Sequence, residues 1–204
     1  MVLLMQVFLK KPVGLKPVYS KDVVALAMEL HTPPEKLYEE MMHMAWSPAP
    51  HIVKMLERYE KNTKLLDRHC KMVRSMEGLG NADVFYSGVA LKETFEPNFR
   101  PIPGVPDMLP IGLVLVLDLY YSLTPSTMVE ATPEVVQLAR LMRVSPQRVT
   151  QALSAFRQCD PFCHRHPPVP EAMLKACRPV WRQWGNADPM AIAARAALLA
   201  EYFK

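Results

Sequence analysis

The strongest constraint on the fold is an internal repeat, in which the chain resembles itself at an offset of 112 positions, from Val2 to Val114. Any two amphipathic helical segments resemble each other to some degree, but an unbroken register over most of the chain favours a duplicated domain. We therefore expect two copies, with a boundary near Asp107: residues 1–107 and residues 108–204. The matched segments are 2–9 with 114–121, 20–41 with 132–153 and, after a few deletions, the GNAD tetrapeptides at 80–83 and 185–188.

The balance of proline and glycine predicts an all-α fold. The chain has 20 prolines and seven glycines in 204 residues. Proline suits the first position of a helix and rigid loops, whereas a sheet with many tight turns needs more glycine. We expect short helices in each copy. The proline-rich segment 93–110, between the copies, is expected to be a stiff, extended connector.

In the second copy, the pattern predicts three helices. The run from Pro110 to Leu123 is apolar on nearly every side and suits a central buried helix, although a buried strand has a similar pattern. Thr132 is expected to cap a second helix through its side chain, and Ser145 a third one that opens with Pro146. Two short helices joined by about three residues outline a helix-turn-helix.

The stretch from Leu113 to Pro161 resembles the helical N-terminal region of a group of HNH restriction endonucleases. This resemblance implies a helix-turn-helix-like fold and DNA recognition. The nuclease part of that family needs paired histidines and an asparagine around a metal, which this chain does not supply, so the resemblance does not extend to nuclease activity. The matching features are residues 119–121, Thr132 to Glu134, Leu138 to Leu141, Ser145 with Pro146, and Phe156 with Asp160 and Pro161.

We expect the helix 146–157 of the second copy to contact double-stranded DNA. Polar side chains near the start of a recognition helix read base edges, and basic groups around it hold phosphates. The expected base-reading residues are Gln147, Arg148 and Gln151, and the expected phosphate contacts are Arg140, Arg143 and Arg157. The alternative is that these side chains form an ordinary solvated helix face.

The corresponding helix of the first copy is unsuited to DNA. It carries Glu35, Glu39 and Glu40 beside Lys36, and such a face repels phosphates. If the protein binds DNA, the first copy would serve self-association or a protein partner. The expected function is that of a non-catalytic DNA-binding protein, either a regulator or a restriction-associated accessory protein. The alternative is a helical protein–protein interaction scaffold that has lost DNA contact.

Cysteine and histidine are concentrated in one region of the second copy. Thiolates and imidazoles are the ligands of structural zinc, but this cluster lacks the second close cysteine pair that makes zinc ribbons recognisable. The alternative is that the cysteines are small buried residues and the histidines lie in a polar loop. An enzyme with a site around the two histidines is a further alternative, although no phosphate loop or nucleophile elbow is present. The zinc candidates are Cys159, Cys163, His164, His166 and Cys177.

Charge and hydropathy predict a cytoplasmic protein. The net charge of +4 permits contact with nucleic acid without requiring it. The uncharged stretch from Met108 to Leu117 is about half as long as a membrane-spanning helix. The apolar N-terminus is followed rather than preceded by its lysines, unlike a secretory signal. We therefore expect no membrane contact and reduced cysteines.

Overall fold

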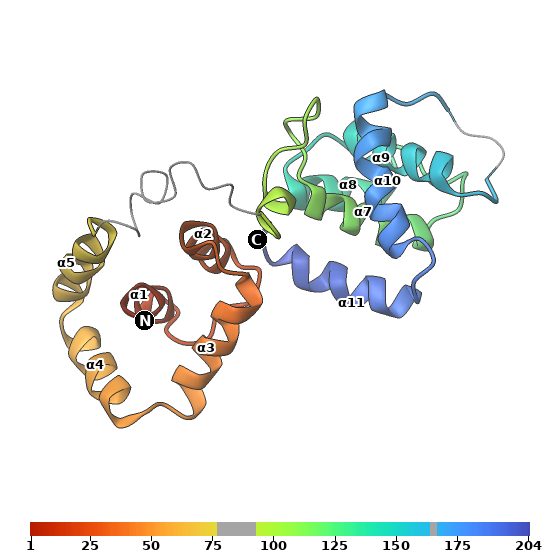
Figure 1. Ribbon diagram of the computed structural model, residues 1–204. Coiled ribbons are helices and arrows are strands. Elements are labelled where there is room, and N and C mark those ends of the chain that lie inside the picture. The colour runs from red at the N-terminus through yellow and green to blue at the C-terminus, as the bar shows by residue number, and fades with distance from the viewer. Residues whose placement is uncertain (77–92, 164–166) are drawn as a thin grey trace. The chain divides into compact units, whose positions relative to one another are not determined.

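The computed structural model describes residues 1–76, 93–163 and 167–204. In these residues the chain forms ten α-helices and one 3-10 helix, and the single β-type pairing is an isolated bridge between Ile102 and Val105. The predicted all-α class is confirmed for this part of the chain. None of its helices is both long and apolar enough to cross a membrane. The chain divides into two compact units, Met1–Glu96 and Pro97–Lys204 (Figure 1).

The first unit is built around a short apolar helix, α1 (Val2–Leu9). Figure 1 shows α1 at the centre of an arc formed by the other four helices. Its residues Leu3, Leu4 and Met5 are buried, because a helix that is apolar on most sides is stable only when it is covered on most sides. The surrounding helices are α2 (Lys21–Leu30), α3 (Pro34–Trp46), α4 (Pro50–Lys61) and α5 (Thr63–Arg74).

The second unit is built around α7 (Pro110–Ser122). Every residue from Ile111 to Leu117 is buried, so the prediction of a central buried helix is confirmed. The aromatic ring of Phe156 lies beside that of Tyr120, with ring centroids 6.3 Å apart. The other helices of this unit are α8 (Pro133–Met142), α9 (Pro146–Cys159), α10 (Glu171–Trp184) and α11 (Pro189–Ala200).

Proline marks the start of six helices in the described residues, as its abundance predicts. Proline has no N–H, and the N–H at the first helical position would have no partner within the helix. Ser145 caps α9 as predicted, through a hydrogen bond from the backbone N–H of Arg148 (3.1 Å). Thr132 does not cap α8 with its side chain, and its hydroxyl donates to the carbonyl of Thr127 (2.5 Å). The six first residues are Pro34, Pro50, Pro110, Pro133, Pro146 and Pro189.

The proline-rich segment is packed rather than extended away from the second unit. It contains the 3-10 helix η1 (Glu96–Phe99) and then the bridge between Ile102 and Val105. Apolar side chains recur at every third position, which places one side of the segment toward the interior. The buried residues are Phe99, Ile102, Val105 and Met108. The expected boundary near Asp107 therefore lies inside the second unit, which begins at Pro97.

Some helix boundaries of the two units match at the offset found in the sequence. At the offset of 112 positions, α2 coincides with α8 from first to last residue, and the first residue of α3 coincides with that of α9. The residues that follow α2 and α8, His31 (φ 47°) and Arg143 (φ 59°), are both left-handed. The two turns are thus closed by the same backbone conformation.

Glu96 is a buried carboxylate at the end of the first unit, 3% exposed. It accepts hydrogen bonds from the backbone N–H groups of Thr94 (2.9 Å) and Phe95 (3.1 Å), and lies 3.4 Å from Nδ1 of His31. Burial raises the pKa of Glu96, but these hydrogen bonds outweigh it and leave the pKa below its ordinary value.

This depressed pKa predicts an acid-dependent contribution to stability. The contribution is complete above the unfolded-state pKa of about 4.3 and is lost as the pH falls through the lower pKa of the folded state. We expect Glu96→Gln to lower the free energy of unfolding by about 1–3 kcal/mol at neutral pH, and by much less near pH 3. Denaturant titrations at both pH values measure this, and an equal loss at both would contradict it.

Candidate functional site

The predicted DNA-contacting region consists of two helices joined by a tight turn. Helix α8 ends at Met142, and α9 begins at Pro146. Between them, Arg143 is left-handed, and the backbone N–H of Val144 donates to the carbonyl of Ala139 (3.0 Å). Both helices pack against α7. The turn is therefore held by backbone hydrogen bonds, by the Ser145 cap and by a shared core.

The six predicted contact residues fall into two groups by exposure. The exposed group lies at the end of α8, in the turn and at the start of α9: Arg140, Arg143 and Gln147. The side chains of this group make no hydrogen bond or ion pair with any described residue. The half-buried group lies farther along α9: Arg148, Gln151 and Arg157. The structure thus separates residues that the sequence placed in a single face.

Arg148 is engaged by partners within the second unit. Its Nε donates to Oδ2 of Asp107 at 2.9 Å, and its Nη1 donates to Oε1 of Gln151 at 2.8 Å. The Arg148 side chain is 26% exposed and that of Asp107 41%. Any contact of Arg148 with an outside group therefore competes with Asp107. This ion pair was not predicted, because Asp107 lies in the segment that the sequence pattern indicates as an extended connector.

The cysteine cluster is only partly gathered in the described residues. Cys177 is fully buried, whereas Cys159 and Cys163 are half-buried, and none of the three forms a disulfide with a described residue. Burial raises the pKa of both Cys177 and Cys159. In the part of the chain that the structure describes, no three potential metal ligands lie close enough together to hold an ion. The other two zinc candidates, His164 and His166, lie outside the described residues.

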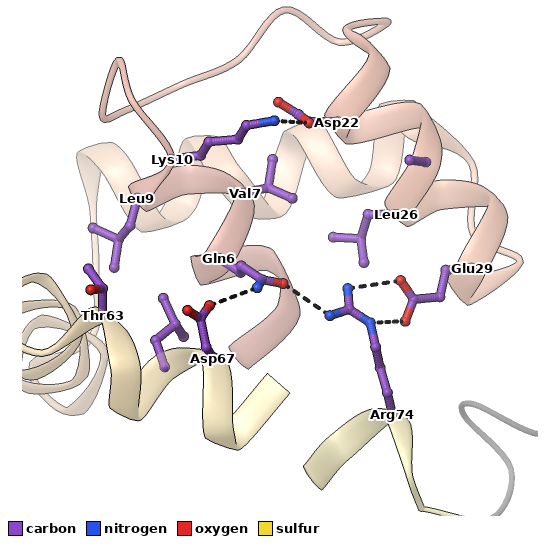
Figure 2. Close-up of a pocket in the computed structure, with 12 residues that line it drawn as sticks. Gln6, Val7, Leu9, Lys10, Asp22, Leu26, Glu29, Thr63, Asp67 and Arg74 are labelled. Carbon is purple, nitrogen blue, oxygen red and sulfur yellow. Dashed lines mark hydrogen bonds and ion pairs between the residues drawn. The ribbon is translucent and has the colours of Figure 1, made fainter. Parts of the chain in front are cut away.

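A polar groove in the first unit, between α1, α2 and α5, was not predicted from the sequence (Figure 2). Arg74 donates to Glu29 through Nε (2.7 Å) and Nη2 (3.1 Å), and to Gln6 through Nη1 (3.2 Å). Gln6 in turn donates to Asp67 (3.2 Å). The available signal was Gln6 itself, the one polar residue in apolar α1, since a polar group in such a helix needs a partner.

Among the described residues that line this groove, four of the five charged ones form two ion pairs, and the fifth, Asp67, accepts a hydrogen bond from a neutral amide. Besides the Arg74 network, Lys10 pairs with Asp22 at 2.5 Å. The hydrogen bond to Glu29 raises the pKa of Arg74, which therefore stays charged. The network joins α5 to α1 and α2 across the groove. Its simplest role is to hold these helices together.

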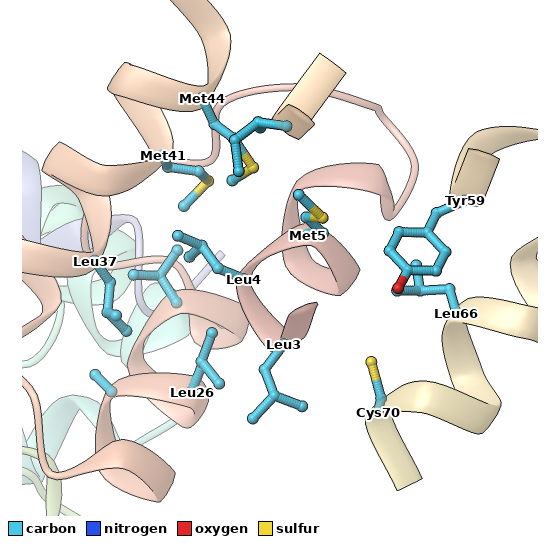
Figure 3. Packing of buried hydrophobic residues seen from close by; sticks show 13 residues of the cluster. Leu3, Leu4, Met5, Leu26, Leu37, Met41, Met44, Tyr59, Leu66 and Cys70 are labelled. Carbon is cyan, nitrogen blue, oxygen red and sulfur yellow. The ribbon is translucent and has the colours of Figure 1, made fainter. Parts of the chain in front are cut away.

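The walls of the groove belong to the hydrophobic core of the first unit (Figure 3). Leu26 and Leu66 line the groove and are also buried in this core. Figure 3 shows Leu3 and Met5 of α1 between the side chains of α2 and α3 and those of α4 and α5, which include Tyr59. The groove therefore rests on a packed interior.

A cavity in the second unit is lined by residues in the same register. Seven residues of α1, its C-cap and α2 line the first unit's groove. Each precedes by 112 positions a residue of α7 or α8 that lines a cavity beside α11. Alanines of α11 form the other wall of that cavity. The seven pairs are Gln6 and Asp118, Val7 and Leu119, Lys10 and Ser122, Asp22 and Glu134, Ala25 and Gln137, Leu26 and Leu138, and Glu29 and Leu141.

The turn before α9 and the groove of the first unit are thus the two regions that the geometry singles out. The first presents basic and amide groups without partners in the described residues, and the second presents two ion pairs and the carboxylate of Asp67. Their interpretation depends on their own chemistry, because comparisons with family models, curated proteins and solved structures find no match to the chain.

Proposed function

We propose that this chain binds double-stranded DNA without catalysing a reaction on it, through α8, the turn and α9. The observation that carries the proposal is the exposed group Arg140, Arg143 and Gln147 around the start of α9, whose side chains lack partners in the described residues. Two helices joined by a short turn are the outline of a helix-turn-helix, whose second helix reads base edges near its N-terminus. Gln147 would contact a base edge, and the two arginines would contact phosphates.

The half-buried residues of α9 take a secondary place in this proposal. Arg148 is held by Asp107 and itself holds Gln151. We expect it to fix the orientation of Gln151 and to reach DNA only after it leaves Asp107. Asp107 then weakens binding in two ways, by retaining Arg148 and by repelling phosphates.

Removing the charge of Asp107 should therefore strengthen DNA binding. We expect Asp107→Asn to raise the affinity for a duplex about fivefold, because the variant breaks one partly exposed ion pair and frees Arg148 to contact DNA. The matched control is Asp22→Asn, which breaks the exposed Lys10–Asp22 pair of the first unit with the same charge change. Fluorescence anisotropy measures both. An Asp107→Asn affinity no higher than that of the control would contradict this role.

We infer further that the two units are tandem copies, of which only the second contacts DNA. The shared helix boundaries, the paired left-handed residues and the seven matched lining residues support the duplication. In the first unit, Glu35, Glu39 and Glu40 are exposed on α3, the counterpart of α9. Their charge opposes contact with phosphates. The resemblance of the second copy to the N-terminal region of HNH restriction endonucleases favours a regulator or a restriction-associated accessory protein.

One observation favours a second candidate, a protein-interaction scaffold. The ion pair of Arg148 with Asp107 removes a cation that a DNA-binding helix would be expected to present. In a scaffold, the exposed arginines would be ordinary surface residues.

The two candidates are separated by fluorescence anisotropy with a mixed-sequence duplex at low and moderate salt. A DNA-binding protein should bind at low salt and lose affinity steeply as salt rises, because phosphate contacts release counterions. A scaffold should show no saturable binding at either salt concentration. Circular dichroism of the same sample verifies that the protein is folded.

A further inference from the structure

A second set of basic side chains lines a cavity at the far end of α9 from the turn. This cavity, of about 360 Å³, lies between the last residues of α9 and one side of α10. It contains none of the residues assigned above to DNA contact. Its lining residues are Gln158, Cys159, Leu174, Arg178, Trp181 and Arg182.

The two arginines of this cavity lack a counter-charge in the described residues. Arg178 and Arg182 are four positions apart on α10 and so lie on the same side of the helix. Both are exposed, and neither makes a hydrogen bond or ion pair with a described residue. Among the described residues, none that lines the cavity carries a carboxylate. Two neighbouring guanidinium groups repel each other, and an anion between them would reverse that repulsion.

The wall that carries these arginines is fixed by packing. The ring of Trp181 stacks on Tyr121, with centroids 6.3 Å apart and planes at 19°, and it also contacts Phe156. On the opposite side of the cavity, the amide of Gln158 donates to the carbonyl of Pro167 (3.0 Å). Arg178 and Arg182 therefore extend from a rigid base, which lowers the entropy lost when they order around a ligand.

We propose that this cavity binds a phosphate group, held by hydrogen bonds from the guanidinium groups of Arg178 and Arg182. The planar fork of arginine matches phosphate oxygens. Two guanidinium groups on one side of a helix supply two positive charges, which balance the charge of a phosphate dianion. The site does not depend on DNA binding by α9. The phosphate belongs either to a free phosphomonoester or to a nucleic-acid backbone, and these two sources are separated below.

Cys159 provides a built-in reporter of occupancy. Burial raises the pKa of its thiol, and the positive charge of nearby Arg178 partly offsets this. Alkylation proceeds through the thiolate. A phosphate on Arg178 would cancel the offset and cover the thiol, so alkylation of Cys159 should slow when the site is filled.

The test follows alkylation of Cys159 by iodoacetamide, with peptide mass spectrometry, as inorganic phosphate is titrated into the full-length protein. We expect saturable slowing of about threefold or more, and a dissociation constant at least about tenfold weaker in Arg178→Gln/Arg182→Gln. Isothermal titration calorimetry measures that constant independently of the thiol. The control is Arg58→Gln, which removes an exposed cation of the first unit.

A parallel arm replaces inorganic phosphate with a mixed-sequence duplex. Slowing by inorganic phosphate but not by the duplex assigns the site to a free phosphate group. Slowing by the duplex alone, abolished in the double variant, assigns it to a nucleic-acid backbone. The proposal is overturned if neither ligand slows alkylation and calorimetry shows no binding, or if the double variant binds phosphate as tightly as the native protein. An Arg140→Gln variant weakened toward DNA should still bind inorganic phosphate, so the two proposals can fail separately.

Discussion

Phe156→Ala should destabilise the second unit by about 3–5 kcal/mol, the range measured for removal of a fully buried aromatic side chain. Phe156 has no exposed surface, and its ring lies 6.3 Å, between centroids, from the rings of both Tyr120 and Trp181. Its removal would leave a cavity where α7, α9 and α10 meet, at the point that fixes α9. We expect unfolding of this unit at a much lower denaturant concentration.

A matched control for this prediction lies in the same unit. Phe162 is 89% exposed, so Phe162→Ala should change stability by no more than about 0.5 kcal/mol. Tryptophan fluorescence reports on the second unit through Trp181 and Trp184, because Trp46 of the first unit is already 78% exposed when folded. Equal losses in the two alanine variants would show that Phe156 does not anchor α9.

Reversing the charge of the two exposed arginines at the turn should produce the largest loss of DNA affinity. Arg140→Glu/Arg143→Glu removes both expected phosphate contacts and adds two repulsive charges at the same place. We expect duplex binding to weaken about a hundredfold at low salt, and the slope of log affinity against log salt to become shallower by about two units. Both residues are exposed, so the protein should stay folded.

The control for this double variant keeps the net charge equal. Arg58→Glu/Arg68→Glu reverses two exposed arginines on α4 and α5 of the first unit. If binding depends on the turn, the control should weaken it only slightly, by the long-range effect of charge. Equal weakening in the two double variants would mean that total charge, and no particular surface, determines the affinity.

The local rules of helix formation made much of this fold predictable. Helices begin at Pro110, Pro133 and Pro146 because the N–H that proline lacks would have no partner at that position. Helix α7 lies at the centre because it is apolar on nearly every side and no side of it favours water. The cap at Ser145 followed from the same reasoning. The predicted side-chain cap at Thr132 is absent, and its hydroxyl donates to a carbonyl of the preceding loop.

The candidate site was harder to predict because its properties depend on distant residues. Sequence spacing placed Gln147 on the outer side of α9, and the structure leaves it exposed. Nothing local to Arg148 indicated its pairing with Asp107, which became possible once the proline-rich segment packed on the second unit. The ion pair of Arg74 with Glu29 in the groove of the first unit likewise joins two helices that are far apart in the sequence, so helical periodicity could not predict it.

The most direct test of the proposed function is a pair of measurements on Arg143→Gly. Arg143 is left-handed (φ 59°), a conformation that is unfavourable for arginine and natural for glycine. We expect Arg143→Gly to raise the free energy of unfolding by about 1 kcal/mol and to weaken duplex binding. Arg143→Ala should weaken binding without the gain in stability. A stabilised Arg143→Gly protein that binds the duplex as tightly as the native chain would contradict the proposed function.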